Sequence, residues 1–451
     1  LGISPIAHGI LKQMDLSAVK AAPGVIAVIT AEDIPGVNNY GPVLEDDPIF
    51  TADEVQYAGQ PLFAVAATTV EAARRAVALA QLEIAELPAI LSADEAAEQD
   101  SFVLPTRTVR VGDSAAALAA APRQIRNRLL LGGQDQFYLE GQIALAIPQD
   151  NGDILLHAST QHPSEVQHTV ARALGKHSHN VMVQCRRMGG AFGGKESQPA
   201  LIAAVAALLA NATGQAVKLR LDRDVDMIVT GKRHDFVIDE RIGFDNDGRI
   251  RAVEFTYAAR CGMSADLSGA INDRTLFHSD NAYYLPSATF VSQRCKTHTV
   301  SNTAFRGFGG PQGMFAIEYA IDDIARELGM DPLTVRLRNF YGTADNNVTP
   351  YGQVVADNII HDLVEELVGT SDYHRRRQEI QTFNQTQSPL RRGIALTPVK
   401  FGISFTTTHL NQAGALIHIY HDGSVYLNHG GTEMGQGPVS YTHLRAHETN
   451  D

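Results

Sequence analysis

Four glycine-dense stretches constrain this chain of 451 residues more than any other feature, because each can bring bare backbone close to a ligand. They occupy residues 132–134, 189–196, 305–312 and 430–437. Glycine lacks a Cβ and adopts positive φ, so the N–H groups of such loops can converge on an anion. One loop of this kind is most often a tight turn. Four together, two of them with aromatic or arginine side chains, favour a binding site built from loops distant in sequence.

The second stretch lies between an alternating apolar segment, residues 181–185, and a helix predicted over about residues 198–210. Such a strand–loop–helix unit presents the positive end of a helix to a phosphate or pyrophosphate. Its spacing also matches a nucleotide-binding P-loop. The residue after Lys195 is Glu196, however, where a P-loop has a hydroxyl for Mg²⁺, and a carboxylate there would repel the phosphates. The sequence therefore argues against nucleotide hydrolysis.

Charge, apolar runs and cysteines exclude several classes of protein. The chain has 37 Lys and Arg against 50 Asp and Glu, a net charge of −13, which argues against broad binding to nucleic acid or anionic membranes. Its longest apolar run, residues 200–210, is about half of what a membrane-spanning helix needs. Three cysteines without a CxxC pair exclude a disulfide framework and a self-contained four-cysteine iron–sulfur site. We expect a cytoplasmic enzyme or enzyme subunit without a signal peptide.

Local patterns predict an α+β fold. Near the N-terminus we expect a strand–helix–strand crossover, with strands at residues 62–66 and 81–87 and a helix over residues 70–80 capped by Thr69. A further strand is predicted at residues 25–29. Hairpin turns are predicted at three clusters of Asp, Asn and Gly, residues 150–153, 245–248 and 422–423. Two more helices are predicted over residues 163–174 and 311–328.

Four motifs around the glycines resemble those of the molybdopterin-binding subunits of the xanthine dehydrogenase and aldehyde oxidase family. They read GGQDQFYLE from residue 132, RMGGAFGGKE from residue 187, TAFRGFGGPQ from residue 303 and GTEMGQG from residue 431. The resemblance runs from near the N-terminus to Gly437. It implies a molybdenum–molybdopterin cofactor in its sulfido form. Because the pterin dithiolene holds the metal in this family, the absence of a cysteine ligand motif does not count against it.

The resemblance also implies the domain organisation. The expected fold is an N-terminal hammerhead-like α/β domain followed by two molybdopterin-binding α+β domains, the second of them C-terminally truncated. The expected boundaries are 1–95 for the hammerhead-like domain, 96–112 for a linker, 113–375 for the first molybdopterin-binding domain, 376–437 for the start of the second and 438–451 for an aberrant tail. The tail, with His443, Arg445 and His447, resembles nothing in the family, and we expect no functional residue there.

Residue by residue, the resemblance assigns the cofactor contacts. Three residues would form the molybdenum environment, namely Gln134, Phe192 and Arg306. The amide of Gln134 would lie near the apical oxo ligand, and Gly193 would offer backbone to the cofactor beside Phe192. Three residues of the last motif would line the pterin and its phosphate, namely Met434, Gly435 and Gln436.

The resemblance places two charged residues, Glu196 and Arg274, at the substrate position. Purine oxidisers of this family use an acid and an arginine there, whereas its aldehyde oxidases have uncharged residues. Both groups can polarise a purine as negative charge builds on its ring, and they are our candidate catalytic residues. Phe308 and Phe405 would sandwich the ring, and Thr406 would hydrogen-bond the substrate. The resemblance therefore favours hydroxylation of purines, hypoxanthine to xanthine to urate, with oxygen derived from water.

The general base of the family is a glutamate near its C-terminus, past the last residue of this sequence, and we expect this chain to lack it. The sequence carries no iron–sulfur or flavin signature, so the resemblance implies a partner subunit with [2Fe–2S] clusters and FAD, in a higher heteromer. A cluster of histidines over residues 157–179 has no zinc-ligand spacing and is read as hydrogen-bonded or surface histidines. Two alternatives stay open: an aldehyde or other N-heterocycle oxidoreductase, and an inactive truncated cofactor-binding scaffold.

Overall fold

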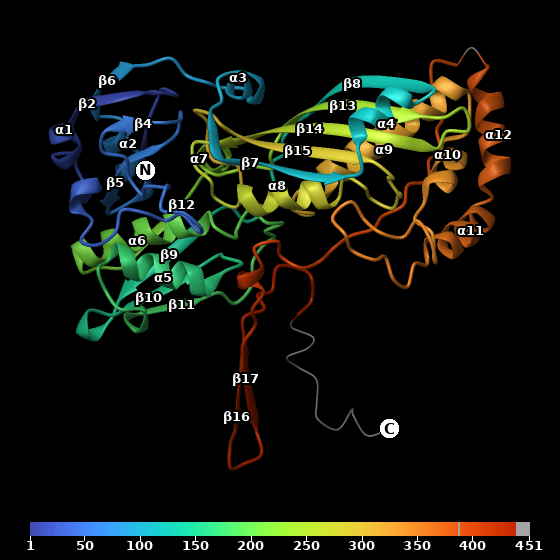
Figure 1. Ribbon diagram of the computed structural model, residues 1–451. Coiled ribbons are helices and arrows are strands. Elements are labelled where there is room, and N and C mark those ends of the chain that lie inside the picture. Colours follow the sequence, from blue (N-terminus) through green and yellow to red (C-terminus); the bar gives the residue numbers. More distant parts are fainter. Residues whose placement is uncertain (387, 439–451) are drawn as a thin grey trace.

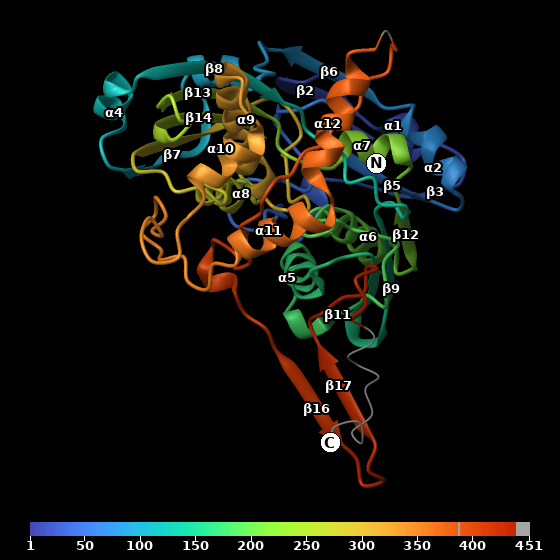
Figure 2. The same ribbon diagram turned by 90° about the vertical axis from the view of Figure 1, so that its right-hand side faces the viewer.

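A computed structural model describes residues 1–386 and 388–438. Figure 1 shows one body on the left, which contains the N-terminal part and a four-stranded sheet, and a second body on the right around a five-stranded sheet. A two-stranded hairpin, β16 (Ala415–Ile419) with β17 (Val425–His429), projects away from both bodies (Figures 1 and 2). None of the described helices is long and apolar enough to cross a membrane.

The N-terminal part holds two three-stranded sheets, with the strand orders β1–β5–β3 and β4–β2–β6. The strands are β1 (Gly2–Ile3), β2 (Gly9–Asp15), β3 (Val25–Thr30), β4 (Glu54–Val55), β5 (Pro61–Ala67) and β6 (Gln81–Glu86). The helices are α1 (Ser17–Lys20), α2 (Val70–Val77) and α3 (Ala93–Glu98). The strands and the helix predicted between residues 25 and 87 are therefore present.

The predicted crossover around α2 is wrong in its pairing. Thr69 does cap the helix, since its Oγ1 accepts a hydrogen bond from the N–H of Ala72 at 3.1 Å. The strands on either side of α2, β5 and β6, nevertheless lie in different sheets, and all pairs within these two sheets are antiparallel. Alternation along a strand indicates which side chains are buried, but the partner of the strand depends on contacts distant in sequence.

The four-stranded sheet packs under one long apolar helix. Its order is β11–β10–β9–β12, with β9 (Ile143–Pro148), β10 (Ile154–Ala158), β11 (Val181–Gln184) and β12 (Val217–Arg220). Two helices belong to it, α5 (Pro163–Ala173) and α6 (Pro199–Thr213). Helix α6 contacts β9 and β12 on one side and β3 and β5 of the N-terminal part on the other. Because it is covered all round, residues 199–210 are all buried, which explains why the run has no polar face.

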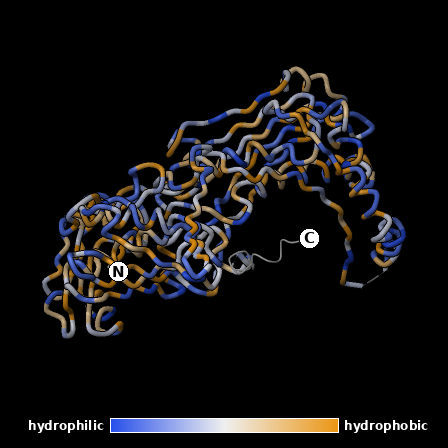
Figure 3. The backbone as a smooth tube through the Cα atoms, turned by 90° about the horizontal axis from the view of Figure 1, so that it is seen from below, coloured by the Kyte–Doolittle hydropathy of each residue, from blue (hydrophilic) through white to orange (hydrophobic). Residues whose placement is uncertain are grey.

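The five-stranded sheet has the order β7–β15–β14–β13–β8. Its strands are β7 (Phe102–Val111), β8 (Arg123–Leu131), β13 (Phe236–Phe244), β14 (Ile250–Gly262) and β15 (Ala288–Lys296). Figure 3 shows hydrophobic and hydrophilic residues interspersed along the chain in both bodies. The remaining helices are α4 (Ser114–Ala120), α7 (Arg223–Val229), α8 (Ser268–Phe277), α9 (Gly310–Leu328), α10 (Pro332–Asn339), α11 (Ile360–Thr370) and α12 (Tyr373–Asn384). Helices α8 and α9 share one hydrophobic core with the sheet.

The three predicted hairpins are present. The pairs β9–β10, β13–β14 and β16–β17 are each antiparallel across the predicted turns. The two longer predicted helices correspond to α5 and α9, and the second ends at Gly329, which has a φ of +64°.

Residues 96–112, expected to be a linker, instead end α3 and form β7, an edge strand of the five-stranded sheet. The proline that suggested a linker, Pro105, lies where the register of β7 against β15 shifts, and its carbonyl accepts a hydrogen bond from Arg294 at 2.8 Å. Proline lacks an N–H to donate but is tolerated in edge strands and at bulges. The strand therefore forms despite Pro105.

Candidate functional site

The second and third glycine stretches lie against each other. Gly193 has a φ of +98°, and a Cβ placed on it would lie 2.8 Å from the carbonyl carbon and oxygen of Ala304. The N–H of Arg306 donates to the carbonyl of Phe192 at 2.9 Å. Only glycine allows so close a backbone approach at this φ. Two of the residues predicted to surround the metal, Phe192 and Arg306, are thus neighbours.

The fourth glycine stretch is joined to the second. The N–H of Met188 donates to the carbonyl of Glu433 at 2.8 Å, and the carboxylate of Glu433 accepts from the N–H groups of Gly435 and Gly437 at 2.7 and 3.3 Å. Gln436 closes the turn, because its side chain donates to the carbonyl of Thr432 at 2.8 Å and accepts from the N–H of Met434 at 2.9 Å. The three predicted pterin contacts therefore share one compact turn.

Arg233 connects the first stretch to the third. Its N–H donates to the carbonyl of Gln134 at 3.0 Å, its guanidinium lies 3.8 Å from the ring centre of Phe305, and its Nη2 donates to the carbonyl of Arg306 at 2.9 Å. Its Nε and Nη1 are buried and have no hydrogen-bond partner among the described residues. Burial lowers the pKa of Arg233 to about 10. Unsatisfied buried donors point to a missing acceptor, so this part of the site fits a ligand with oxygen or nitrogen acceptors.

A buried lysine, which sequence reasoning considered only as a P-loop residue, supports the second stretch. The Nζ of Lys195 donates to Ser159 at 2.8 Å and lies 3.8 Å from the carboxylate of Glu140. That carboxylate accepts from the N–H of Gly189 at 2.6 Å. The ammonium group also lies 4.7 Å from the ring centre of Tyr138, and burial lowers the pKa of Lys195 to about 8. Lys195 is thus turned into the protein and cannot reach a phosphate as a P-loop lysine does.

The structure brings four of the five predicted substrate residues together beside α8, which itself carries Arg274. Arg274, only 4% exposed, lies 5.7 Å from the ring centre of Phe308. The rings of Phe308 and Phe405 are 5.1 Å apart and inclined by 50°, and Thr406 donates to the carbonyl of Ala270 in α8 at 2.8 Å. At this spacing the two rings contact each other, so a planar ligand between them requires them to separate.

The guanidinium of Arg274 is already engaged by backbone. Its Nη1 donates to the carbonyl of Gly402 at 2.5 Å, and its Nη2 donates to the carbonyls of Ile403, at 3.3 Å, and Ser404. Its Nε is buried without a hydrogen-bond partner among residues 1–386 and 388–438. Three of the five N–H groups of Arg274 are thus engaged, and the Nε–H is one of the two that remain.

The fifth predicted substrate residue, Glu196, ends the second glycine stretch, where it lies within electrostatic range of His162, Asp266 and Glu165. The pKa of its carboxyl is raised to about 7, mainly by burial; His162 lowers it, and the charges of Asp266 and Glu165 add to the rise. No hydrogen bond or ion pair between Glu196 and Arg274 occurs in the described part of the chain. A carboxyl with a pKa near neutrality can act as donor or acceptor toward a ring nitrogen.

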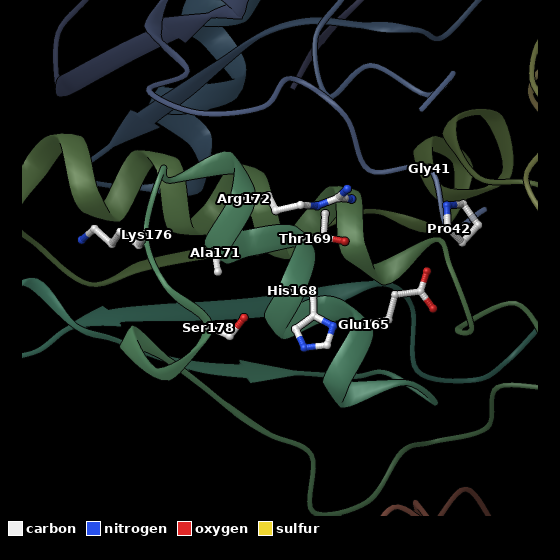
Figure 4. Close-up of a pocket in the computed structure, with 9 residues that line it drawn as sticks. All are labelled: Gly41, Pro42, Glu165, His168, Thr169, Ala171, Arg172, Lys176 and Ser178. Carbon is white, nitrogen blue, oxygen red and sulfur yellow. The ribbon is translucent and has the colours of Figure 1, made fainter. Parts of the chain in front are cut away.

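A surface pocket away from these residues is drawn in Figure 4. It measures about 440 Å³ and lies between α5 and the loop at Gly41 and Pro42. None of the residues predicted for cofactor or substrate lines it. Its lining carries both signs of charge, from Glu165 and from Arg172 and Lys176, which gives no single ligand chemistry.

Comparison with known proteins assigns the chain to a family. A family model for the molybdopterin cofactor-binding domain matches residues 96–340, more than half of the chain. The chain belongs to this family. A model for the hammerhead domain of aldehyde oxidase and xanthine dehydrogenase matches residues 1–88, and a second molybdopterin cofactor-binding model matches residues 366–448. Of the expected tail, residues 439–451 lie outside the described residues.

Relatives of known name support the same assignment. The chain is 40% identical to the xanthine dehydrogenase/oxidase of Gallus gallus over 96% of its length and 42% identical to the xanthine dehydrogenase of Drosophila subobscura over 95%. It spans 32% of the length of each of these relatives. The resemblance to the xanthine dehydrogenase and aldehyde oxidase family is therefore confirmed.

Solved structures confirm the α+β fold. The aldehyde oxidoreductase from Desulfovibrio gigas superposes with a TM-score of 0.82 at 24% identity, over 95% of this chain and 48% of that one. Quinoline 2-oxidoreductase from Pseudomonas putida 86 gives a TM-score of 0.84 at 21% identity, over 97% of this chain and 59% of that one. The family name implies a bulky, acceptor-rich cofactor. The close backbone approach of Gly193 to Ala304 and the Nε and Nη1 donors of Arg233, which have no partner among the described residues, fit such a group.

Proposed function

We propose that this chain is the molybdenum-cofactor portion of an oxidoreductase that hydroxylates purines, hypoxanthine to xanthine to urate. The observation that carries the proposal is the cluster of Arg274, Phe308 and Phe405 beside the glycine loops, with Glu196 on the adjoining loop. A buried cation, two aromatic rings and a titrating carboxyl match the chemistry of a flat, nitrogen-rich heterocycle. Xanthine dehydrogenases at 40% identity support the same substrate class.

In this proposal, one set of residues binds the cofactor and another binds the substrate. When bound, the molybdenum–pterin group supplies transfer of a water-derived oxygen to carbon and accepts two electrons. Gln134, Phe192, Gly193, Arg306 and the turn at 434–436 would hold it. Glu196 would donate to or accept from a ring nitrogen, because its pKa of about 7 makes both forms available at neutral pH.

Arg274 would stabilise negative charge as it develops on the ring. A preorganised cation in a water-poor site acts most strongly where charge appears in the transition state. The carbonyls of residues 402–404 hold the guanidinium in place before the substrate arrives. The rings of Phe308 and Phe405 would separate to admit the purine, and Thr406 would hydrogen-bond it. We assign the general base to none of the carboxylates described here.

The proposal includes a partner subunit or domain that accepts the electrons from the cofactor. The three cysteines are unpaired, and the described residues contain no cluster of His, Cys, Asp or Glu that could hold a metal ion. We infer a cytoplasmic heteromer in which a subunit or domain with [2Fe–2S] clusters and FAD takes up the electrons. The sulfido form of the cofactor is part of the same proposal.

The test compares two substrates on the protein purified with its native partners. We expect molybdenum and pterin in the complex and oxidation of xanthine faster than that of benzaldehyde. The variant Arg274→Met should depress xanthine oxidation at least about tenfold more than benzaldehyde oxidation, since only the purine needs the cation. Glu196→Gln should act in the same direction.

Each alternative has its own outcome. Equal losses on the two substrates in Arg274→Met would contradict purine recognition by this residue. Wild-type preference for the aldehyde would favour an aldehyde oxidoreductase, and a complex free of molybdenum and pterin would favour the inactive scaffold.

A further inference from the structure

One buried carboxylate, which the sequence motifs did not indicate, joins the segments that carry the predicted substrate residues. Asp266 is 2% exposed and lies between β14 and α8. Its Oδ2 accepts from the hydroxyl of Ser197 at 2.7 Å and the amide of Gln198 at 2.9 Å. Its Oδ1 accepts from the hydroxyl of Thr303 at 2.8 Å and the N–H of Leu267 at 2.5 Å. All four acceptor positions of the carboxylate are therefore in use.

The donors belong to the segments that carry the candidate site residues. Ser197 follows Glu196 directly, and Thr303 begins the segment that continues to Phe308. Leu267 precedes the first residue of α8, the helix that carries Arg274. The carboxylate thus joins three segments that are 37 to 106 residues apart in sequence.

The backbone at Asp266 adopts a conformation that few side chains tolerate. Its φ is +40°, in the left-handed region, where aspartate and asparagine occur more often than other residues with a Cβ. Such positions persist when the surroundings over-determine them, and they cluster at functional sites. The four hydrogen bonds to one side chain supply that determination here.

The N-terminal part also forms hydrogen bonds with the residues just before Asp266. The hydroxyl of Ser264 donates to Asp47 at 2.6 Å, and the N–H of Ala265 donates to Asp46 at 2.8 Å. Asp47 is itself only 1% exposed. Residues 264–266 are therefore clamped between the N-terminal part and the site.

We propose that Asp266 is a positioning residue that sets the spacing between the loop carrying Glu196 and the helix carrying Arg274. Its consequence for substrate choice rests on the proposed function, whereas its role in holding the two segments does not. A carboxylate is required at this position because all four groups that face it donate hydrogen bonds.

The two oxygens allow a selective disruption. In Asp266→Asn, the amide oxygen can keep the contacts of Oδ1 with Thr303 and Leu267, but the amide nitrogen then opposes the amide donor of Gln198, and Ser197 can only accept from it. Gln198 cannot invert its own amide without loss, because its Oε1 accepts from the N–H of Gly231 at 2.9 Å. The variant therefore releases the loop of Glu196 and leaves α8 and residue 303 connected.

Amide hydrogen exchange tests the positioning directly. In the full protein we expect Asp266→Asn to accelerate exchange in peptides covering residues 189–198, with little change over 267–277 and 303–309. Glu240→Gln is the matched control, since Glu240 is a buried carboxyl, 1% exposed, in β13 of the five-stranded sheet, and it should alter neither loop. Acceleration of all three segments alike, or of none, would overturn the proposal.

Substrate choice tests the consequence. Asp266→Asn should lower kcat/KM for xanthine about 10- to 100-fold, mainly through KM, while benzaldehyde turnover changes much less, because a displacement near 1 Å costs about that factor. Equal losses on both substrates would mean a purely structural role. If the wild-type protein oxidises no purine, the proposed function fails, and the exchange pattern alone decides the positioning role.

A milder variant keeps the proposal testable if Asp266→Asn does not fold. Ser197→Ala removes one donor to Oδ2 and leaves Gln198 in place. It should accelerate exchange over residues 189–198 and reduce xanthine turnover in the same substrate-selective way, by a smaller factor. Unchanged exchange in this variant would contradict the assignment.

Discussion

Replacement of Gly193 by alanine should destabilise the fold and the proposed cofactor site, although it adds only one methyl group. At a φ of +98°, an L-residue pays about 1–2 kcal/mol for the left-handed backbone. The new methyl group would also lie 2.8 Å from the carbonyl carbon and oxygen of Ala304 and 2.9 Å from the nitrogen of Phe305. These are backbone atoms, which cannot swing aside as a side chain does. Overpacking of this kind costs about 1–3 kcal/mol, so we expect a loss of about 2–5 kcal/mol in all.

Gly352 provides the matched control. Its φ is +85°, and a Cβ placed on it would have no atom within 4 Å. Gly352→Ala therefore carries the conformational cost of about 1–2 kcal/mol without the clash. The difference between the two variants isolates the close approach of the second and third glycine stretches.

Two measurements on the purified complex check the reasoning. Urea unfolding should place the midpoint of Gly193→Ala below that of Gly352→Ala, and molybdenum content per chain should fall only in Gly193→Ala. If the two variants unfold at the same urea concentration and both retain full molybdenum, the contact between Gly193 and Ala304 does not shape the site.

Two further predictions concern buried ionisable groups. Burial lowers the pKa of His278 to about 4, so the fold favours its neutral form, and the stability this confers above pH 6.5 is lost as the pH falls toward 4. Urea unfolding at pH 7 and 4.5 should show a loss approaching about 3 kcal/mol, which His278→Gln reduces; an equal loss in the variant would exclude His278 as its source. Lys195→Met removes the hydrogen bond to Ser159, and we expect it to cost about 1–3 kcal/mol and to lower molybdenum content. Full molybdenum content in that variant would show that Lys195 does not support the glycine loop.

Elements with local signals could be predicted from the sequence. Thr69 caps α2 because its side chain reaches an N–H three residues on, and the hairpin turns depend on Asp, Asn and Gly within a few positions. The strand over residues 102–111 was missed because Pro105 is a local breaker, whereas the β15 strand that stabilises β7 lies some 180 residues further along the chain.

The same distinction between local signals and partners distant in sequence applies to the site. Residues with a family motif, such as Gly193 and Arg306, could be placed by resemblance, and the structure brings their loops together. Asp266, Lys195 and Arg233 belong to the same region, but no motif or periodicity indicates them. Apart from Leu267, which neighbours Asp266, their hydrogen-bond partners are 36 to 99 positions away, and a buried polar group is recognised only once its acceptor or donor is placed.

Under the proposed function, the hydrogen bonds of Arg274 to backbone couple substrate recognition to the position of residues 402–406. Its guanidinium holds the carbonyls of residues 402–404, and His278 accepts the N–H of Gly402 at 3.0 Å. The same segment continues to Phe405 and Thr406. A substrate that draws Arg274 toward itself therefore also pulls on the segment that carries Phe405. The rings of Phe405 and Phe308 must separate to admit a planar ligand. We therefore expect binding of the ligand by Arg274 and separation of the two rings to occur together.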